Sequence, residues 1–382
     1  MKQKNRLFKL LPVMLAFFVM GFVDLVGAIT NFVKEDFGLS DSIAKVLPAM
    51  AFFWFFILSV PTGMLINRIG RRKTIVLSLA VTSLALLVPL FGYSFPVMLV
   101  SFSLLGIGNT LIQVSINPLI SGMISEKRLA STMTFGQFVK AIASFLGPVV
   151  AIWVSLTFNN WKILFPVFMT VSILATLWLG MTRIEEEKES AGGSGFWECL
   201  KLLGNPLILL SFIGIMCHVG IDVGINTTTP EIMKEYFGMS REDAGFASSV
   251  YFLFRLAGCL AGAFVLARWS GRKVFTASVL LMAVAIAGLI FFHSRETVYA
   301  CIALIGLGNA NIFPVIVSQA LLHLPGRRNE VSALMIMGLI GGTVFPLLMG
   351  KASDLMATQT GSLLILGITV LYLLLFSPKL KK

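Results

Sequence analysis

Charged residues are scarce in this chain: Asp, Glu, Lys and Arg make up 13% of its 382 residues, against about 25% in an ordinary soluble domain. Hydrophobic residues account for 57%, and the mean hydropathy is +0.90. This composition excludes a soluble enzyme, a nucleic-acid-binding domain and a disordered chain. The net charge of +12 does not indicate a nucleic-acid partner, because the basic residues lie at the ends of apolar segments.

Motifs of cofactor and metal chemistry are also missing. The four cysteines, Cys199, Cys217, Cys259 and Cys301, lie in or beside apolar segments without metal-ligand spacing, so neither a disulfide framework nor a zinc site is indicated. The sequence has no Walker loop, no nucleophile elbow and no His-Glu-x-x-His pair. We therefore expect no enzyme activity, no metal, no cofactor and no ATP-driven transport by this chain acting alone.

Long apolar segments dominate the chain. A helix needs about 20 apolar residues to cross a bilayer, and twelve segments meet this length. They cover residues 9–33, 43–67, 73–92, 96–124, 131–156, 161–181, 205–232, 242–267, 273–292, 297–324, 330–356 and 360–377. The first follows a basic start without a small-residue cleavage site, which favours a membrane span over a removable signal peptide. The sequence predicts an all-α membrane protein with twelve transmembrane helices.

The distribution of Lys and Arg predicts how these helices are oriented. With the N-terminus in the cytoplasm, 21 of the 30 basic residues fall in cytoplasmic segments, 7 fall on the other side, and two fall within spans. Cytoplasmic loops of membrane proteins carry the excess of Lys and Arg. We therefore expect a multi-pass protein of the bacterial inner membrane with both termini in the cytoplasm.

The sequence repeats itself with an offset of 200 residues. Lys34-Glu-Asp-Phe-Gly-Leu-Ser40 recurs as Lys234-Glu-Tyr-Phe-Gly-Met-Ser240, Arg72-Lys73 as Arg272-Lys273, and Gly106-x-Gly108-Asn109 as Gly306-x-Gly308-Asn309. These matches indicate a duplicated six-helix unit. We predict an N-terminal bundle over 1–181, a solvated cytoplasmic linker over 182–203 and a C-terminal bundle over 204–382. Parallel repeats of this kind occur in transporters whose halves rock around a midplane site.

The loop between the second and third spans carries a family resemblance. Its sequence, Gly63-Met-Leu-Ile-Asn67-Arg68-Ile-Gly70-Arg71-Arg72-Lys73, resembles the signature of the major facilitator superfamily between helices 2 and 3. The resemblance implies a gating loop formed by Gly63, Asn67, Arg68, Gly70, Arg71 and Arg72. The family usually has Asp at the position of Asn67, so the charge clasp with neighbouring helix ends is expected to be weaker here. Generic cytoplasmic positive charge is the alternative interpretation.

Further segments resemble the fucose–galactose–glucose–proton symporter branch of that superfamily. They are Ile112-Gln-Val-Ser-Ile-Asn-Pro118, Val219-Gly-Ile-Asp-Val-Gly224, Phe254-Arg-Leu-Ala-Gly258 and Ile305-Gly-Leu-Gly-Asn-Ala-Asn-Ile-Phe-Pro314. Fucose-type members of the branch have a proton-handling Asp at the position of Ala28 and a Glu at that of Gln113, whereas glucose/galactose-type members share the Gln. The fucose-type carboxylate pair is therefore not carried over. Asp24, one helical turn before Ala28 on the same face, is the candidate substitute.

Four ionisable side chains lie inside predicted spans, where a charge is costly and suggests a function. They are Asp24, Lys140, Asp222 and Arg255, one acid and one base in each half, and we expect the pairs Asp24–Lys140 and Asp222–Arg255. Asp24 is the first candidate for the proton carrier and Asp222 the second, with a permanent stabilising pair as the alternative. Lys140 either neutralises Asp24 or binds a substrate carboxylate, and the second role would make the cargo an acidic sugar.

Polar side chains repeat every four residues on several spans, a spacing that places them on one helix face. Amides both donate and accept hydrogen bonds, as recognition of sugar hydroxyls requires. Hydrogen bonding between helices is the alternative explanation. The candidate substrate-binding residues are Asn109, Gln113, Asn117, Gln137, Lys140, His218, Asn226, Arg255, Asn311 and Gln319.

These patterns together predict a monomeric secondary active transporter that imports a sugar with a proton by alternating access. A proton gradient is the expected driving force. The expected partners are a small-molecule substrate and the lipid bilayer, with no nucleic acid. A facilitator or exporter of an amphiphilic or peptidoglycan-derived compound is the alternative. Such a protein would need a cavity lined mainly by Phe and Met, and the amide stripes argue against it.

Overall fold

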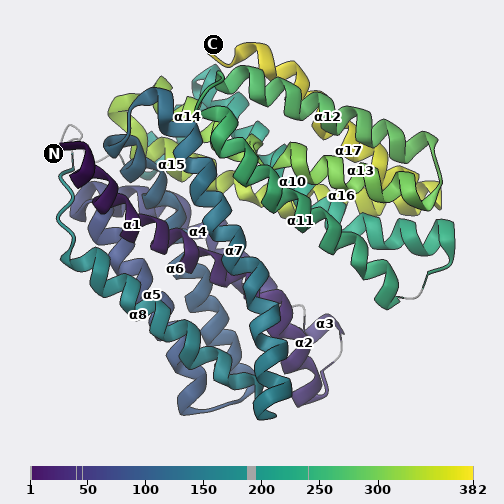
Figure 1. Cartoon of the computed structure of the whole chain (residues 1–382), viewed down its shortest axis with the longest axis horizontal. Helices are drawn as coiled ribbons and strands as arrows, with labels where there is room; N and C mark the ends of the chain where they lie inside the picture. The colour runs from purple at the N-terminus through teal and green to yellow at the C-terminus, as the bar shows by residue number, and fades with distance from the viewer. Residues whose placement is uncertain (1, 40, 45, 187–194, 240, 382) are drawn as a thin grey trace. The chain divides into compact units, whose positions relative to one another are not determined.

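The computed structural model describes residues 2–39, 41–44, 46–186, 195–239 and 241–381. Across these ranges the chain forms α-helices joined by short loops and 3₁₀ turns, without a β-strand (Figure 1). Contacts divide it into two compact units. Unit 1 comprises Met1–Met123, Gly136–Leu200 and Gly326–Met337, and unit 2 comprises Ile124–Phe135, Lys201–Pro325 and Gly338–Lys382. Residues 187–194 of the predicted linker lie outside the described residues.

Each half of the sequence supplies a series of long helices. The first half contains α1 (Lys2–Met20), η1 (Gly21–Asp24), α2 (Leu25–Phe37), α3 (Asp41–Ala44), α4 (Val46–Ile69), α5 (Arg71–Phe91), α6 (Phe95–Met123), α7 (Glu126–Phe158), η2 (Trp161–Ile163), α8 (Leu164–Met181) and α9 (Phe196–Lys201). The second half contains η3 (Leu202–Gly204), α10 (Pro206–Phe237), α11 (Arg241–Leu266), α12 (Gly271–Phe291), α13 (Arg295–Asn309), α14 (Ile312–His323), η4 (Pro325–Arg327), α15 (Arg328–Met337), η5 (Gly338–Ile340), α16 (Gly341–Met356), α17 (Thr360–Phe376) and η6 (Ser377–Lys379).

The first predicted span is not one continuous helix. α1 ends at Met20, the 3₁₀ turn η1 covers Gly21–Asp24, and α2 begins at Leu25. Among the described residues, eleven helical stretches are long and apolar enough to cross a membrane, and they correspond to the second to twelfth predicted spans. The three pieces together cover the predicted segment 9–33. The twelve-span organisation therefore stands, with a discontinuous first helix.

The internal repeat is present in the structure. α5 and α12 begin and end at positions that differ by 200. α2 and α10, which end the first and seventh spans, are each followed by a left-handed glycine with φ +60°, Gly38 and Gly238. A left-handed residue at a helix C-terminus is favourable for glycine because glycine lacks a Cβ. Equivalent glycines also allow equivalent helices to pack closely. A Cβ on Gly306 of α13 would lie 2.5 Å from the backbone oxygen of Tyr251 on α11, and a Cβ on Gly106 of α6 would clash with the backbone oxygen of Ala51 on α4. The two halves thus share the same helix contacts.

A proline inside a span frees the backbone carbonyl four residues earlier, because proline has no N–H to donate. For two of the prolines, a side chain of a neighbouring helix donates to the freed carbonyl. Pro118 of α6 frees the carbonyl of Val114, and the Ser332 hydroxyl of α15 donates to it over 2.7 Å. Pro314 frees the carbonyl of Ala310 at the break between α13 and α14, and the thiol of Cys259 donates to it over 3.6 Å. Neighbouring helices thus satisfy both freed groups, as the interior of a bilayer requires.

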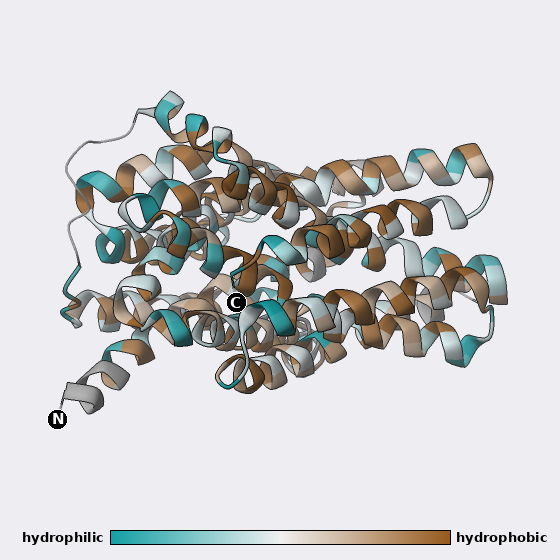
Figure 2. Ribbon diagram, turned by 90° about the horizontal axis from the view of Figure 1, so that it is seen from above, coloured by the Kyte–Doolittle hydropathy of each residue, from teal (hydrophilic) through white to brown (hydrophobic). Residues whose placement is uncertain are grey.

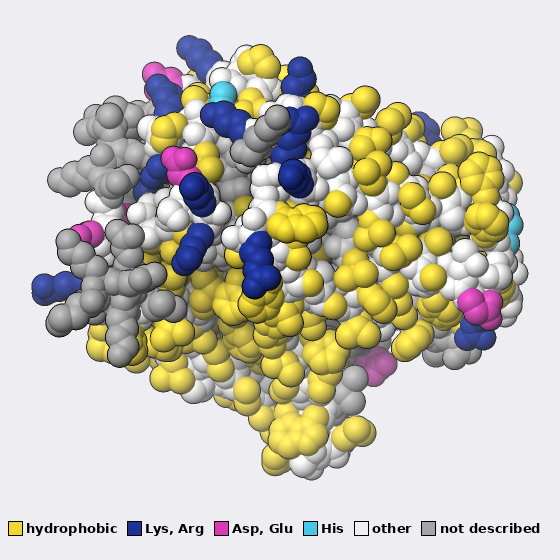
Figure 3. All heavy atoms as spheres, turned by 45° about the horizontal axis from the view of Figure 1, so that its top comes forward, with side chains coloured by type: hydrophobic (Ala, Val, Ile, Leu, Met, Phe, Trp, Pro, Cys, Tyr) yellow, Lys and Arg dark blue, Asp and Glu magenta, His cyan; other side chains and the backbone are white. Residues whose placement is uncertain are grey.

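The exposed sides of the helices are largely apolar, as expected for helices that contact lipid. In Figure 2 the brown hydrophobic residues run along the lengths of the helices, while teal hydrophilic residues are frequent near helix ends and loops. The space-filling view in Figure 3 shows hydrophobic side chains over much of the visible surface. Large exposed hydrophobic residues occur on nearly every long helix, for example Phe91, Leu156, Trp153, Phe264 and Leu375. In an aqueous environment patches of this extent would cause association, which a bilayer prevents.

Candidate functional site

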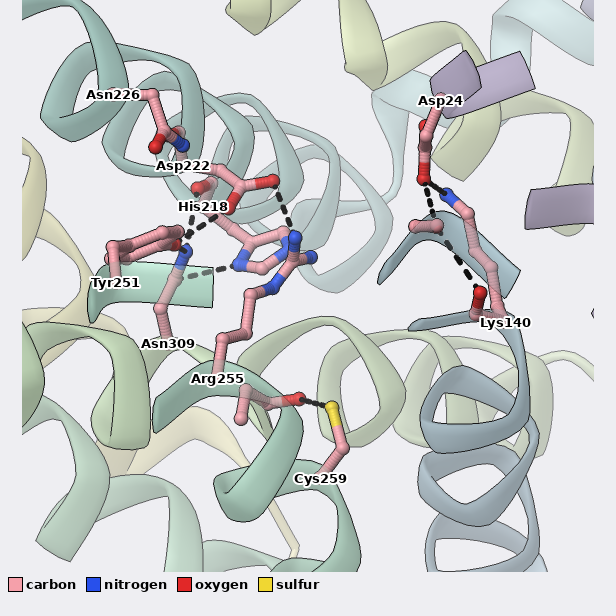
Figure 4. A network of polar contacts seen from close by, with 11 residues as sticks. Asp24, Lys140, His218, Asp222, Asn226, Tyr251, Arg255, Cys259 and Asn309 are labelled. Atoms are coloured by element: carbon pink, nitrogen blue, oxygen red, sulfur yellow. Dashed lines mark hydrogen bonds and ion pairs between the residues drawn. The ribbon is translucent and has the colours of Figure 1, made fainter. Parts of the chain in front are cut away.

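Asp24 lies at the break in the first span and forms an ion pair in unit 1. Its Oδ2 is 3.5 Å from the Nζ of Lys140 on α7, and it accepts a 2.6 Å hydrogen bond from the hydroxyl of Ser144, one helical turn further on. The Asp24 side chain is 35% exposed and that of Lys140 21%. The structure therefore brings together the first predicted pair, and the serine adds a neutral donor to it (Figure 4).

Gly21 and Asn109 explain why the first span can break beside Lys140. A Cβ on Gly21 would lie 2.6 Å from the backbone oxygen of Lys140, so only glycine allows the turn to approach α7 this closely. The break also interrupts the helical hydrogen bonds of α1. The side-chain amide of Asn109 on α6 donates to the carbonyl of Met20 over 2.6 Å, which satisfies the last residue of α1. The position of Asp24 is thus fixed from two neighbouring helices.

The predicted amide stripe of α6 forms a ladder along the helix. Gln113 donates to the side-chain oxygen of Asn109 over 2.6 Å, and Asn117 donates to the backbone oxygen of Gln113 over 3.0 Å. All three side chains are buried. Gln137 is half-buried on α7, and none of the hydrogen bonds found in the described part of the chain involves its side chain. The ladder stabilises α6 and, through Asn109, the break that carries Asp24.

Unit 2 contains the second predicted pair within a longer polar network. Nη1 of Arg255 on α11 is 3.0 Å from Oδ2 of Asp222 on α10. The hydroxyl of Tyr251 donates to the other carboxylate oxygen over 2.6 Å and accepts from the amide of Asn309 over 2.9 Å. Nδ1 of His218 is 2.7 Å from the amide oxygen of Asn309. Figure 4 shows these side chains converging from α10, α11 and α13.

The direction of the hydrogen bonds in this network follows from the donors available. Tyr251 uses its one hydroxyl proton on Asp222, so it can only accept from Asn309, which orients the amide. The oxygen of Asn309 then faces His218 and can only accept, so Nδ1 of His218 carries the proton. Tyr251 is fully buried. Its hydroxyl therefore supports the ion pair, and its buried ring is not available to stack on a sugar.

The three remaining candidates of the second half lie at separate positions. Asn226 donates to the backbone oxygen of Asp222 over 2.7 Å, and its own side-chain oxygen is buried without a hydrogen-bond partner among the described residues. Asn311 lies at the break between α13 and α14 and packs against Gly262, where a Cβ would clash with its amide. Gln319 accepts from the backbone N–H of Lys381 over 3.3 Å, near the end of the chain.

The predicted gating loop belongs to a second polar cluster within unit 1. Asn67 at the end of α4 donates to Glu330 over 2.9 Å and accepts from the amide of Asn329 over 2.6 Å. Nε of Arg71 donates to the side-chain oxygen of Asn329 over 2.8 Å. Gly63 allows α4 to approach α15, because a Cβ there would lie 3.0 Å from that of Ala333. The carboxylate that the family usually has at position 67 is thus replaced by an amide that pairs with Glu330.

The start of α5 is capped by the predicted linker. The carboxylate of Glu186 accepts from the backbone N–H groups of Arg71 and Arg72 over 2.6 and 2.8 Å. Gly70 precedes them with φ +93°, and a Cβ there would lie 3.2 Å from the same carboxylate. The Arg72 guanidinium donates to the backbone oxygens of Leu179 and Gly180 at the end of α8. Arg68 is exposed. A carboxylate at a helix N-terminus interacts favourably with the helix dipole.

Cys199 lies beside this cluster, outside the membrane-spanning segments. Its thiol is buried and donates to the backbone oxygen of Glu330 over 3.7 Å. Burial raises the pKa of Cys199 to about 12, the negative charge of Glu330 contributes in the same direction, and Arg327 opposes them. The thiol is therefore protonated and weakly reactive at neutral pH.

Sequence reasoning missed four participants in these clusters: Tyr251 as a hydrogen-bond donor, Glu186, Asn329 and Glu330. Glu186 was hidden in an acidic run that is typical of a solvated linker. The repeat gives no hint of Asn329 and Glu330, because the corresponding positions in the first half are Leu129 and Ala130. A usable signal was Glu330 itself, an acid at the very start of an apolar segment.

Comparison with known proteins identifies the family. The sequence model of the Major Facilitator Superfamily matches residues 13–230 and 211–381. The chain belongs to the Major Facilitator Superfamily. A glucose/galactose transporter of Brucella abortus is 26% identical to this major facilitator over 381 residues, which cover 92% of this chain and 89% of that protein. A putative glucose/galactose transporter of Helicobacter pylori is 24% identical over 395 residues, which cover 95% of this chain and 94% of that protein.

Solved structures of other major facilitators share the fold. The Escherichia coli fucose:proton symporter FucP matches with a TM-score of 0.85 at 16% identity, over 98% of this chain and 99% of that chain. The proton:xylose symporter XylE, bound to 6-bromo-6-deoxy-D-glucose, matches with a TM-score of 0.76 at 16% identity, over 99% of this chain and 96% of that chain. This chain is therefore a multi-pass membrane transporter and not an enzyme.

Proposed function

We propose that this major facilitator imports a sugar together with a proton by alternating access. The curated relatives are named glucose/galactose transporters, and the two solved structures are proton-coupled sugar symporters. The observation that carries the proposal is the ion pair between Asp24 and Lys140 at the break in the first span. We place the protein in a bacterial inner membrane, as a monomer with both termini in the cytoplasm.

The geometry around Asp24 supports a role in proton coupling. A carboxylate that is one-third exposed within a membrane span must contact water or polar groups, since lipid would make its charge too costly. While Lys140 lies beside Asp24, its ammonium group compensates the negative charge of the carboxylate. A substrate that displaced the ammonium group would favour the protonated carboxyl group, and this would link sugar binding to proton uptake. Asp222 is the second candidate carrier because it is held in a comparable pair.

The two ion pairs also favour a neutral hexose over an acidic sugar. Lys140 faces Asp24, and Arg255 faces Asp222, so each cation already has a carboxylate within 3.5 Å. A substrate carboxylate would have to compete with an acid that is already in place. Hydroxyl groups of a neutral sugar instead need donors and acceptors such as Gln113, Asn117, Gln137 and Asn226. The half-buried Gln137, three residues before Lys140, is the first of these to test.

The decisive experiment compares two transport modes of purified protein in proteoliposomes. Asp24→Asn should abolish sugar accumulation driven by a proton gradient, because no carboxylate remains to take up the proton. Counterflow exchange of labelled sugar should persist, since it needs no net proton movement. Asp354→Asn, which removes an exposed acid near the end of α16, is the matched control and should retain both modes. Preserved accumulation in Asp24→Asn would refute the assignment of Asp24.

The substrate class is tested by thermal-shift binding to glucose, galactose, an amino sugar and glucuronate at two pH values. A ligand that binds the folded protein raises its melting temperature. Stabilisation by a neutral hexose is expected. Stabilisation by glucuronate alone would assign Lys140 to a substrate carboxylate. No response to any sugar, together with stabilisation by amphiphilic compounds, would favour the facilitator or exporter alternative.

A further inference from the structure

A surface hollow lies where α11 ends and α12 begins in unit 2. It has a volume of about 240 Å³ and is lined by Arg268, Trp269, Ser270 and Lys273. Arg268, Trp269 and Lys273 are exposed. The neighbouring Arg272 is half-buried at the start of α12. The hollow therefore has a strongly basic wall and one large aromatic side chain.

These cations have no acidic partner in the part of the chain that the structure describes. None of Arg268, Arg272 and Lys273 takes part in an ion pair there, and no side-chain oxygen accepts from the first backbone N–H groups of α12. The C-terminal turn η6 packs nearby through a hydrogen bond between Thr276 and Ser377, and it brings a further lysine, Lys379, rather than an acid. The charge of the hollow is thus uncompensated.

The internal repeat shows what fills the corresponding place in the first half. Arg68, Arg72 and Lys73 of unit 1 correspond to Arg268, Arg272 and Lys273 at the offset of 200. In unit 1 the carboxylate of Glu186 accepts from two backbone N–H groups at the start of α5. The equivalent helix start in unit 2 has the same cations and a hollow instead of a carboxylate. The repeated architecture thus leaves a place for an anion that the described chain does not supply.

The position of the hollow indicates the source of that anion. It lies at the start of α12, Gly271–Phe291, which is long and apolar enough to cross a membrane. Trp269 is 63% exposed, and exposed tryptophans are enriched at the level of the lipid headgroups. The positive-inside pattern places this loop at the cytoplasmic leaflet, where basic pockets bind anionic headgroups.

We propose that the hollow formed by Arg268, Trp269, Ser270 and Lys273 binds the phosphate of an anionic phospholipid from the cytoplasmic leaflet. Arg268 and Lys273 contact the phosphate, the N–H groups at the start of α12 face it, and the Trp269 ring lies along the upper acyl chain. The lipid occupies in the second half the place that Glu186 occupies in the first. This site is separate from the polar networks at Asp24 and Asp222.

The test measures lipid binding to purified protein in detergent, with phosphatidylglycerol, phosphatidylcholine and inorganic phosphate as the three probes. Phosphatidylglycerol should raise the melting temperature of the wild-type protein, and phosphatidylcholine should not. Arg268→Gln combined with Lys273→Gln should weaken phosphatidylglycerol binding about 30-fold, since two surface cations next to the headgroup are removed. Arg68→Gln combined with Lys73→Gln removes the same charge from the first half and should leave this binding unchanged.

Equal loss of lipid binding in both double variants would overturn the proposal, because it would show a general charge effect. Stabilisation by inorganic phosphate to the same extent as by phosphatidylglycerol would overturn the lipid assignment and leave a free-anion site.

A second measurement does not depend on the stability of the double variant. Brominated phosphatidylglycerol should quench tryptophan fluorescence in the wild-type protein and clearly less in Trp269→Phe, and equal quenching would contradict the location.

Discussion

Tyr251 shows how a single hydroxyl group can hold a charged pair in place inside a membrane protein. The hydroxyl donates to Asp222 and accepts from Asn309, and the ring is fully buried among α10, α11 and α13. Without it, one carboxylate oxygen of the half-buried Asp222 would lose its hydrogen bond, and the buried amide of Asn309 would keep only a 3.4 Å hydrogen bond to the backbone oxygen of His218. Leaving such groups unsatisfied costs more than the hydrogen bond itself contributes.

We therefore predict that Tyr251→Phe destabilises the protein by about 1–3 kcal/mol, the range for a buried polar group left without a partner. The measurement is the melting temperature or the denaturant midpoint of the purified protein. Tyr372→Phe is the matched control, because the Tyr372 hydroxyl is half-buried and donates only to the backbone oxygen of Leu210. Its effect should be smaller. If both variants lower the free energy of unfolding by the same amount, the Tyr251 hydroxyl contributes no more than an ordinary hydrogen bond, and the prediction is wrong.

At the scale of whole helices, α6 and α15 are joined by a proline-dependent hydrogen bond. Pro118 cannot donate to the carbonyl of Val114, and Ser332 supplies the missing donor. Ser332→Ala should therefore cost about 1–3 kcal/mol, since a buried carbonyl loses its partner. In a Pro118→Ala background the new N–H of residue 118 can reach the same carbonyl, and Ser332→Ala should then cost clearly less. A thermal-unfolding double-mutant cycle measures this coupling, and additive effects would refute the explanation.

The same elements show how much of the fold the sequence determines. Apolar length, Lys and Arg asymmetry and the 200-residue repeat were sufficient to predict the helices and the pairing of Asp24 with Lys140 and Asp222 with Arg255. The break at Gly21–Asp24 was not predicted, because it depends on a close approach to α7 that no local pattern records. The contact between Asn67 and Glu330 joins positions 263 apart in the sequence, where neither periodicity nor the repeat gives a signal.

Each half of the sequence contributes a segment to the compact unit formed mainly by the other half. Gly326–Met337 belongs to unit 1, where Asn329, Glu330 and Ser332 make their hydrogen bonds. Ile124–Phe135 belongs to unit 2, where Ser131 donates to the backbone oxygen of Ala263. A transport cycle in which the sequence halves rock against each other must break these contacts and form them again.

Cys199 offers a direct measurement of that step, because Gly326–Met337 covers its thiol. Cys217 and Cys301 are replaced by Ala, and Cys259 by Ser, which keeps a donor for the carbonyl of Ala310. In this background, alkylation of Cys199 at pH 8 should be about a thousandfold slower than that of an ordinary thiol, since a pKa of about 12 instead of 9 leaves little thiolate. Glu330→Gln removes a charge that raises this pKa and should accelerate alkylation. Arg327→Gln removes a charge that lowers the pKa and should slow alkylation.

A transported sugar should accelerate the alkylation of Cys199 by moving Gly326–Met337 away from the thiol. An alkylation rate that does not change when sugar is added would mean that this segment stays in place during transport.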